Sequence, residues 1–153
     1  MDCFYHKSTI VLNILLLSAT VFEILPTLQF LEKQNELASL SEFSYRSNRI
    51  FTLVGGVGSP MMSFALGRAE FKNIHLVVHA GLAGSFNKEY ELGSLVEVIA
   101  ECWADLGAEE QDGSFSDLFQ LRLLDAGQYP FEDGWIKTKD SPITLDIPKV
   151  KGL

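Results

Sequence analysis

Apolar and polar positions divide the chain into two kinds of segment. Segments rich in apolar residues that predict strands lie at 13–18, 50–54, 74–78 and 92–100. Apolar residues at helical spacing predict helices at 24–31 and 60–71. Strands that alternate with helices form a mainly parallel sheet covered on its faces, so we expect an α/β fold. The polar segment 32–49 predicts helix or loop.

The first apolar run allows two interpretations. Residues 10–17 are apolar and follow Lys7, as in a signal peptide that ends near Ser18. The alternative is a buried strand at 13–18, preceded by an extension, residues 1–12, of unknown role. The run is too short to span a bilayer as a helix. We favour the strand because a loop and a helix pattern follow it.

Composition narrows the function classes. The chain has 153 residues, of which 47% are hydrophobic, and this suffices for one domain with a real core. Its formal charge of −8 disfavours binding to nucleic acid, since phosphate backbones attract basic proteins. No polybasic run favours a membrane surface either. We therefore expect neither nucleic acid nor a membrane as partner, and the two widely spaced cysteines favour a cytoplasmic protein with free thiols.

Cysteine and histidine positions give no metal site. Cys3 and Cys102 lie too far apart in sequence for a metal or redox motif, so we expect free thiols. His75 and His79 fall in one strand-like run, where residues four apart are about 13 Å from each other. One metal ion cannot bind both side chains. We expect neither a metal nor a cofactor.

Two glycine segments follow predicted strands. Residues 55–60, Gly-Gly-Val-Gly-Ser-Pro, fit a helix start with Ser59 as N-cap and Pro60 as first residue. They match neither the dinucleotide fingerprint nor a P-loop, so a tight turn and a ligand loop remain open. Residues 79–87 end a strand in small residues with Gly81 and Gly84. We favour a ligand site there over a crowded turn.

Glu23 is the candidate acidic group where the first strand ends. Thr20 and Glu23 have capping-box spacing, which would give Glu23 a structural role. Pro26 argues against that register, because it would lie deep in the helix, so we expect the helix to begin at 22–25. Glu23 would then be free to meet a ligand. The segments that follow three predicted strands contain Glu23, residues 55–59 and residues 81–84. We expect all three segments to meet at the same edge of the sheet.

Together these segments resemble the purine nucleosidase/phosphorylase family, and its futalosine hydrolase branch in particular. The stretches that carry the resemblance are 15–24, 54–58, 79–86 and 102–109, within a match over 13–153. The resemblance implies a three-layer α/β domain with a mainly parallel or mixed sheet of the nucleoside phosphorylase type. It also implies a homodimer.

The resemblance implies that water replaces the base of a purine nucleoside through an oxocarbenium-like sugar. Glu23 matches the glutamate that holds and activates the water. Ala83 and Gly84 match the loop near the base, and Gly56 and Gly58 match the loop on the ribose side. Phe86 is placed near the ligand.

The nucleophile can be inferred from missing residues. Phosphorylases of this family hold phosphate with arginines in two loops, where this chain has Ala19-Thr20-Val21 and His79. A neutral edge binds a phosphate dianion poorly, so we expect hydrolysis. The expected reaction is futalosine to hypoxanthine plus dehypoxanthine futalosine, a step of menaquinone biosynthesis.

The catalytic acid of the family has no match in this chain. The resemblance places it, with a ribose-binding Met-Glu pair, beyond Leu153, so the domain at 13–153 would be C-terminally incomplete and we expect this chain alone to be inactive. Two other functions stay open. One is a methylthioadenosine/S-adenosylhomocysteine nucleosidase, and the other is a non-catalytic fragment.

Overall fold

The computed structural model describes residues 11–31, 40–139, 141 and 143–153. The chain divides into two compact units, Met1–Ser85 and Phe86–Leu153. In this described part of the chain, two helices, two mixed sheets and one antiparallel pair of strands form a mixed α/β structure, which confirms the predicted class. Most of the N-terminal extension, residues 1–10 with Cys3, lies outside the described residues.

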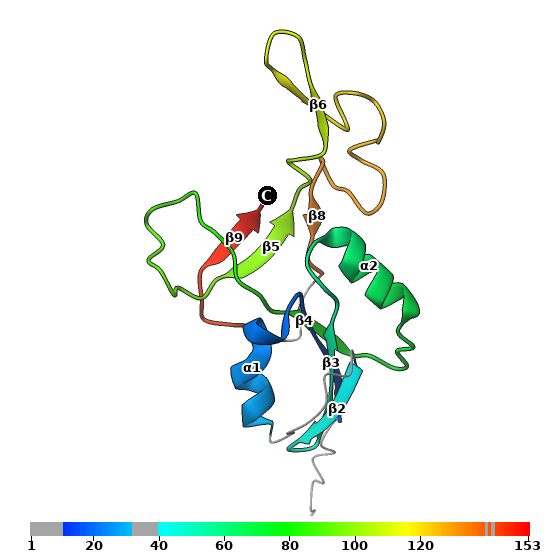
Figure 1. Ribbon diagram of the computed structural model, residues 1–153, viewed down its shortest axis with the longest axis vertical. Coiled ribbons are helices and arrows are strands. Elements are labelled where there is room, and N and C mark those ends of the chain that lie inside the picture. The colour runs from blue at the N-terminus through cyan, green and yellow to red at the C-terminus, as the bar shows by residue number, and fades with distance from the viewer. Residues whose placement is uncertain (1–10, 32–39, 140, 142) are drawn as a thin grey trace, which may run out of the picture. The chain divides into compact units, whose positions relative to one another are not determined.

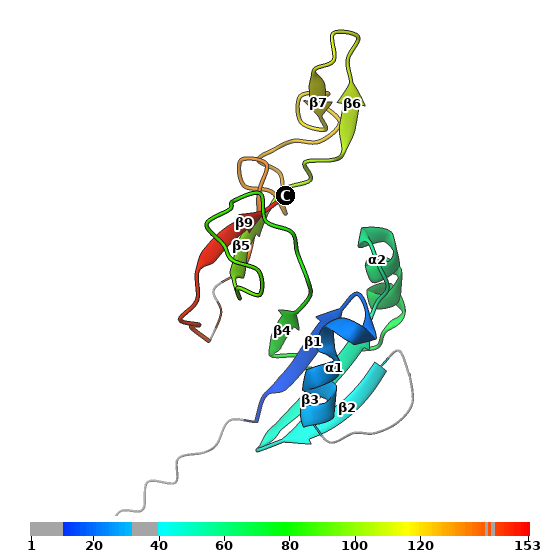
Figure 2. The same cartoon turned by 60° about the vertical axis from the view of Figure 1, so that its left-hand side comes forward.

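The first unit contains a four-stranded sheet of order β2-β3-β1-β4 (Figure 2). The central strand β1 (Asn13–Ser18) lies parallel to β3 (Asn48–Val54) on one side and to β4 (Leu76–His79) on the other. The edge strand β2 (Leu40–Tyr45) is antiparallel to β3. The strand favoured at 13–18 is therefore present, with the same bounds.

Two helices lie on either side of this sheet (Figure 1). Helix α1 (Val21–Phe30) contacts β1, and α2 (Ser59–Arg68) contacts β3. The connection from β1 leads to β3 on one side of it in the sheet. The connection from β3 crosses back over β1 and leads to β4 on the other side. Because such crossovers are right-handed, this reversal places the helices on opposite faces. In this strand order the topological switch point lies between β1 and β4, and α/β proteins bind ligands at the carboxyl ends of such strands.

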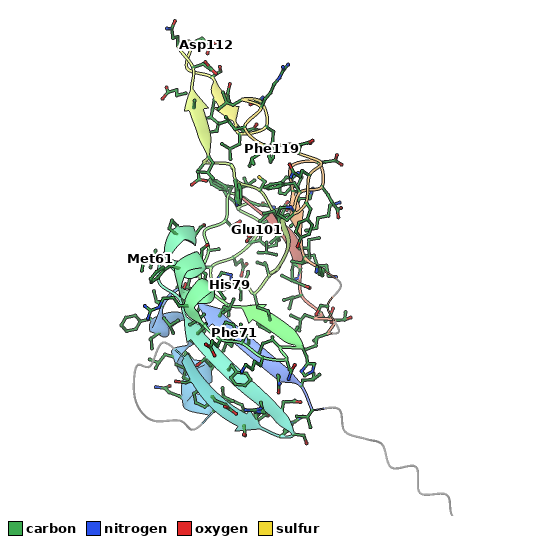
Figure 3. All side chains as sticks on the ribbon, turned by 90° about the vertical axis from the view of Figure 1, so that its right-hand side faces the viewer. Met61, Phe71, His79, Glu101, Asp112 and Phe119 are labelled. Atoms are coloured by element: carbon green, nitrogen blue, oxygen red, sulfur yellow. The ribbon has the colours of Figure 1, made fainter. Side chains whose placement is uncertain are left out.

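The core of the first unit follows the alternation of side chains along the strands. Leu15 and Leu17 of β1 and Leu53 of β3 form a buried cluster. Burying each such side chain contributes about 1.5–3 kcal/mol. Partly buried residues from β3, α2 and the segment after α2 complete the layer: Phe51, Ala65, Leu66, Ala69, Phe71 and Ile74. Figure 3 labels Phe71 in this layer.

Three element predictions were wrong in part. The polar segment 32–49 contains β2, not only helix or loop, and Phe43 is buried in it. An edge strand exposes much of its surface, so it lacks the apolar run of a central strand. The run at 92–100 becomes strand only from Glu97, because Leu92 is exposed and Gly93 has φ +87° in a turn. Helix α2 ends at Arg68 rather than 71.

The second unit consists of strands and turns. Its three-stranded sheet has β5 (Glu97–Glu101) between antiparallel β8 (Ile136–Lys137) and parallel β9 (Lys149–Gly152). A separate hairpin pairs β6 (Gly107–Glu109) with β7 (Phe115–Asp117). The rings of Trp103 and Phe119 each pack edge-on against buried Phe131, with centroids 5.1 Å and 5.2 Å away.

Candidate functional site

Backbone hydrogen bonds join the carboxyl ends of β1, β3 and β4. Gly55 N–H donates to Ser18 O at 2.9 Å, and Gly56 N–H donates to Ala19 O at 3.1 Å. On the other side, Ala80 N–H donates to Leu17 O at 2.9 Å. The loops that follow these three strands therefore start side by side at one edge of the sheet.

Glu23, in the first turn of α1, places its carboxylate among these loops. Its Oε2 accepts three hydrogen bonds: from Thr20 N–H at 2.7 Å, from Thr20 Oγ1 at 3.0 Å and from Ser18 Oγ at 3.0 Å. Its Oε1 accepts one, from Leu82 N–H at 3.2 Å. The side chain is half-buried, and Ser18 beside it is fully buried. Glu23 thus connects the end of β1 with the loop after β4.

These donors lower the pKa of Glu23 from 4.5 to about 2. The largest cause is the Leu82 N–H, followed by the Thr20 N–H, the Thr20 hydroxyl and the Ser18 hydroxyl. Each stabilises the charged form, and partial desolvation opposes them only weakly. Glu23 is therefore a fixed negative charge at neutral pH.

The predicted start of α1 was wrong. Thr20 is the N-cap and Glu23 the third helical residue, so the two have the capping-box register that Pro26 was expected to prevent. Pro26 instead lies inside the helix, where it removes one hydrogen bond, the one to the carbonyl of Phe22. The Phe22 side chain is 84% exposed, which indicates that water can reach this turn. Glu23 is consequently a capping residue as well as a site candidate.

The glycine segment after β3 forms a close turn into α2. Gly56 and Gly58 have φ of +96° and +86°, a region in which residues with a Cβ are strained. A Cβ at Gly55 would collide with the side chain of Met62. Gly58 is the N-cap of α2 and Ser59 lies inside the helix, so the predicted N-cap was off by one residue.

The glycine segment after β4 approaches the carboxylate directly. A Cβ at Gly81 would lie 3.1 Å from Glu23 Oε1, which explains why the smallest residue stands there. Ala83 and Gly84 follow in an exposed loop, and a Cβ at Gly84 would meet no atom within 4 Å. Phe86 is 92% exposed and is the first residue of the second unit.

His75 and His79 lie at opposite ends of β4. His79 is its last residue, at the same edge as Gly81, and is labelled in Figure 3. His75 precedes the strand, and its Nδ1 accepts a hydrogen bond from Asn13 N–H at 2.9 Å. Among the residues described, no three His, Cys, Asp or Glu side chains are grouped to hold a metal ion. Cys102 is a free thiol.

The sequence interpretation missed three partners of Glu23. Ser18, the Thr20 hydroxyl and the Leu82 N–H were not assigned to it. The capping-box spacing of Thr20 and Glu23 could have indicated that the Thr20 hydroxyl lies beside the Glu23 carboxylate. The Leu82 contact spans 59 residues and depends on strand order, so no local pattern could give it.

No helix in the described part of the chain is long and apolar enough to cross a membrane. Comparison with protein-family models, with curated proteins and with solved structures gave no match.

Proposed function

We propose that the chain belongs to a hydrolase that cleaves the N-glycosidic bond of a purine nucleoside, with futalosine as substrate. In this proposal the first unit is part of a three-layer domain of the nucleoside phosphorylase type. The protein is a cytoplasmic homodimer and uses no cofactor. Glu23 is its catalytic carboxylate, and Gly56, Gly58, Ala83 and Gly84 line the substrate.

One observation carries the proposal: an ionised carboxylate stands where the loops after β1, β3 and β4 meet. Helix capping accounts for the contact between Glu23 and Thr20. It does not account for the hydrogen bond from Leu82 N–H, nor for the approach of Gly81 to the same oxygen. A fixed negative charge at a switch point suits a reaction whose sugar becomes positive.

The low pKa of Glu23 defines its role. A carboxylate with a pKa of about 2 is a weak base and does not ionise water in the ground state. Water that attacks an oxocarbenium ion becomes strongly acidic as the new C–O bond forms, so a weak base suffices at that stage. Glu23 would hold the water in line with the sugar carbon and accept its proton late. The electron pair of the breaking C–N bond leaves with the purine, which takes a proton from an acid.

The charges at this edge of the sheet favour the binding of water over phosphate as the nucleophile. The segment after β1 presents Thr20, whose hydroxyl and N–H both donate to Glu23 rather than outward. A phosphate dianion would meet the charge of Glu23 without an arginine from the segments 19–21 or 79–84. Repulsion therefore favours the neutral nucleophile.

The test is purine release by the full-length protein. Futalosine, methylthioadenosine and adenosylhomocysteine are supplied separately, and the free base is quantified by chromatography. Glu23→Gln should lower kcat about 10²–10⁴-fold. Asp112→Asn is the matched control, because Ser114 lowers the pKa of this carboxylate in the second unit, and it should retain full activity.

Each outcome separates the candidate functions. Cleavage of methylthioadenosine alone would reject futalosine as substrate but keep the reaction class. No release from any nucleoside would reject the enzyme and favour a non-catalytic protein, in which Glu23 caps α1 and fixes the loop after β4.

A further inference from the structure

The two oxygens of the Glu23 carboxylate have unequal surroundings. Oε2 accepts three hydrogen bonds, whereas Oε1 accepts one. A carboxylate oxygen has about two lone-pair directions, so three donors saturate Oε2 and one donor leaves Oε1 able to accept another proton. Oε1 is also the oxygen on the side of Gly81 and Leu82.

Ser18 faces Glu23 because side chains along β1 alternate between the two faces of the sheet. Leu15 and Leu17 pack into the core with α2, so Ser18 faces the opposite side, toward α1 and Glu23. Its side chain is fully buried at a position where an apolar residue would continue the run. Its Oγ lies 2.8 Å from Thr20 O and 3.0 Å from Glu23 Oε2, and its single proton can be donated to either acceptor. The charged oxygen is the stronger acceptor.

Thr20 contributes twice to the same oxygen. Its N–H makes the shortest of the four bonds to Glu23, at 2.7 Å, and its hydroxyl adds another at 3.0 Å. The capping box consists of two bonds, from Thr20 N–H to the Glu23 carboxylate and from Glu23 N–H to the Thr20 hydroxyl oxygen. The protons that the Ser18 and Thr20 hydroxyls donate to Oε2 are additional to these two bonds.

We infer that Ser18 and Thr20 are positioning residues, which hold Glu23 Oε2 so that Oε1 is the oxygen that faces the attacking water. This inference rests on the proposed nucleoside hydrolysis. Ser18 and Thr20 touch neither water nor sugar in this scheme and act only through Glu23. Their contribution is the orientation of the carboxylate, since Glu23 is ionised at neutral pH with or without one of them.

The experiment combines a readout that needs no substrate with one that does. The pKa of Glu23 is measured by carbon NMR of the labelled carboxyl group in the wild type, Ser18→Ala, Thr20→Val and Thr20→Ser. Kinetics of purine release are measured on the same variants of the complete gene product. Thr20→Ser keeps the hydroxyl and is the conservative rescue. Ser116→Ala is the matched control, because it removes a hydroxyl that donates to Glu110 at 2.8 Å in the second unit.

Loss of either hydroxyl should raise the Glu23 pKa by about one unit. It should also lower kcat about 10–100-fold with KM nearly unchanged, as expected for a displaced reacting group. Thr20→Ser and Ser116→Ala should match the wild type. If Ser18→Ala fails to fold, the comparison of Thr20→Val with Thr20→Ser still tests whether a hydroxyl at position 20 orients Glu23.

An unchanged Glu23 pKa and kcat in Ser18→Ala and Thr20→Val would overturn the inference, as would a rise in KM alone. The proposed function fails in a different way. In that case the wild type releases no purine, while the Glu23 pKa still rises in both variants.

Discussion

Leu82 N–H donates a hydrogen bond to Glu23 Oε1 across 59 residues of sequence, at 3.2 Å. This contact couples the helix that follows β1 to the loop that follows β4. It is also the largest cause of the low Glu23 pKa.

Gly81→Ala should disturb the link without touching either bonded group. The new Cβ would lie 3.1 Å from Glu23 Oε1, so the carboxylate or the loop must shift by a few tenths of an ångström. Weakening the Leu82 bond should raise the Glu23 pKa above about 2, measurable by carbon NMR. Gly84→Ala is the control, because its new Cβ would meet no atom within 4 Å, and it should leave the Glu23 pKa unchanged. Equal effects of the two variants would contradict the geometry.

Glu23 should make stability depend on acid pH. Its folded-state pKa of about 2 lies below its unfolded value of 4.5, so the charged form stabilises the fold above pH 4.5. That contribution should disappear as the pH falls from about 5 to about 2. Chemical denaturation at about pH 7 and about pH 2 should show Glu23→Gln less stable than the wild type at the higher pH only. A difference that is the same at both pH values would be inconsistent with the hydrogen bonds described.

Leu53→Ala should be strongly destabilising. Leu53 is 2% exposed in the cluster with Leu15 and Leu17, and truncation in such a core costs about 2–5 kcal/mol. Leu92→Ala is the same substitution at a fully exposed side chain and should change the free energy of unfolding by less than about 0.5 kcal/mol. Urea denaturation of both variants checks the location of the core.

Purine release should not require phosphate. Because Glu23 is ionised and the loop after β1 supplies no arginine, inorganic phosphate should not accelerate the reaction. The sugar product should carry oxygen from labelled water, detected by mass spectrometry. A phosphorylated sugar as the product would identify a phosphorylase instead.

Much of the first unit could be predicted because its signals are local. The apolar run at 13–18 is buried on both faces, so it could be identified without knowledge of its neighbours. Strand β2 could not, since an edge strand depends on pairing with β3 more than on its own composition. Leu92 was predicted as part of a strand because it is apolar, but it lies exposed in a turn. An apolar residue need not be buried.

The candidate site was predicted as a meeting of three strand ends, and the structure brings those ends together through hydrogen bonds from Gly55, Gly56 and Ala80. The immediate surroundings of Glu23 were not predicted. Pro26 was given too much weight, although a helix tolerates one lost hydrogen bond where water reaches it. The roles of Gly56, Gly58, Ala83, Gly84 and Phe86 toward a ligand stay predictions.

The most direct test of the central claim is hypoxanthine release from futalosine by the complete gene product, compared between the wild type and Glu23→Gln. The wild type should release hypoxanthine steadily, and the variant should lose about 10²–10⁴-fold in kcat with its fold retained at neutral pH. Equal release by both proteins would show that Glu23 only caps α1. Release by neither would contradict the assignment of nucleoside hydrolysis itself.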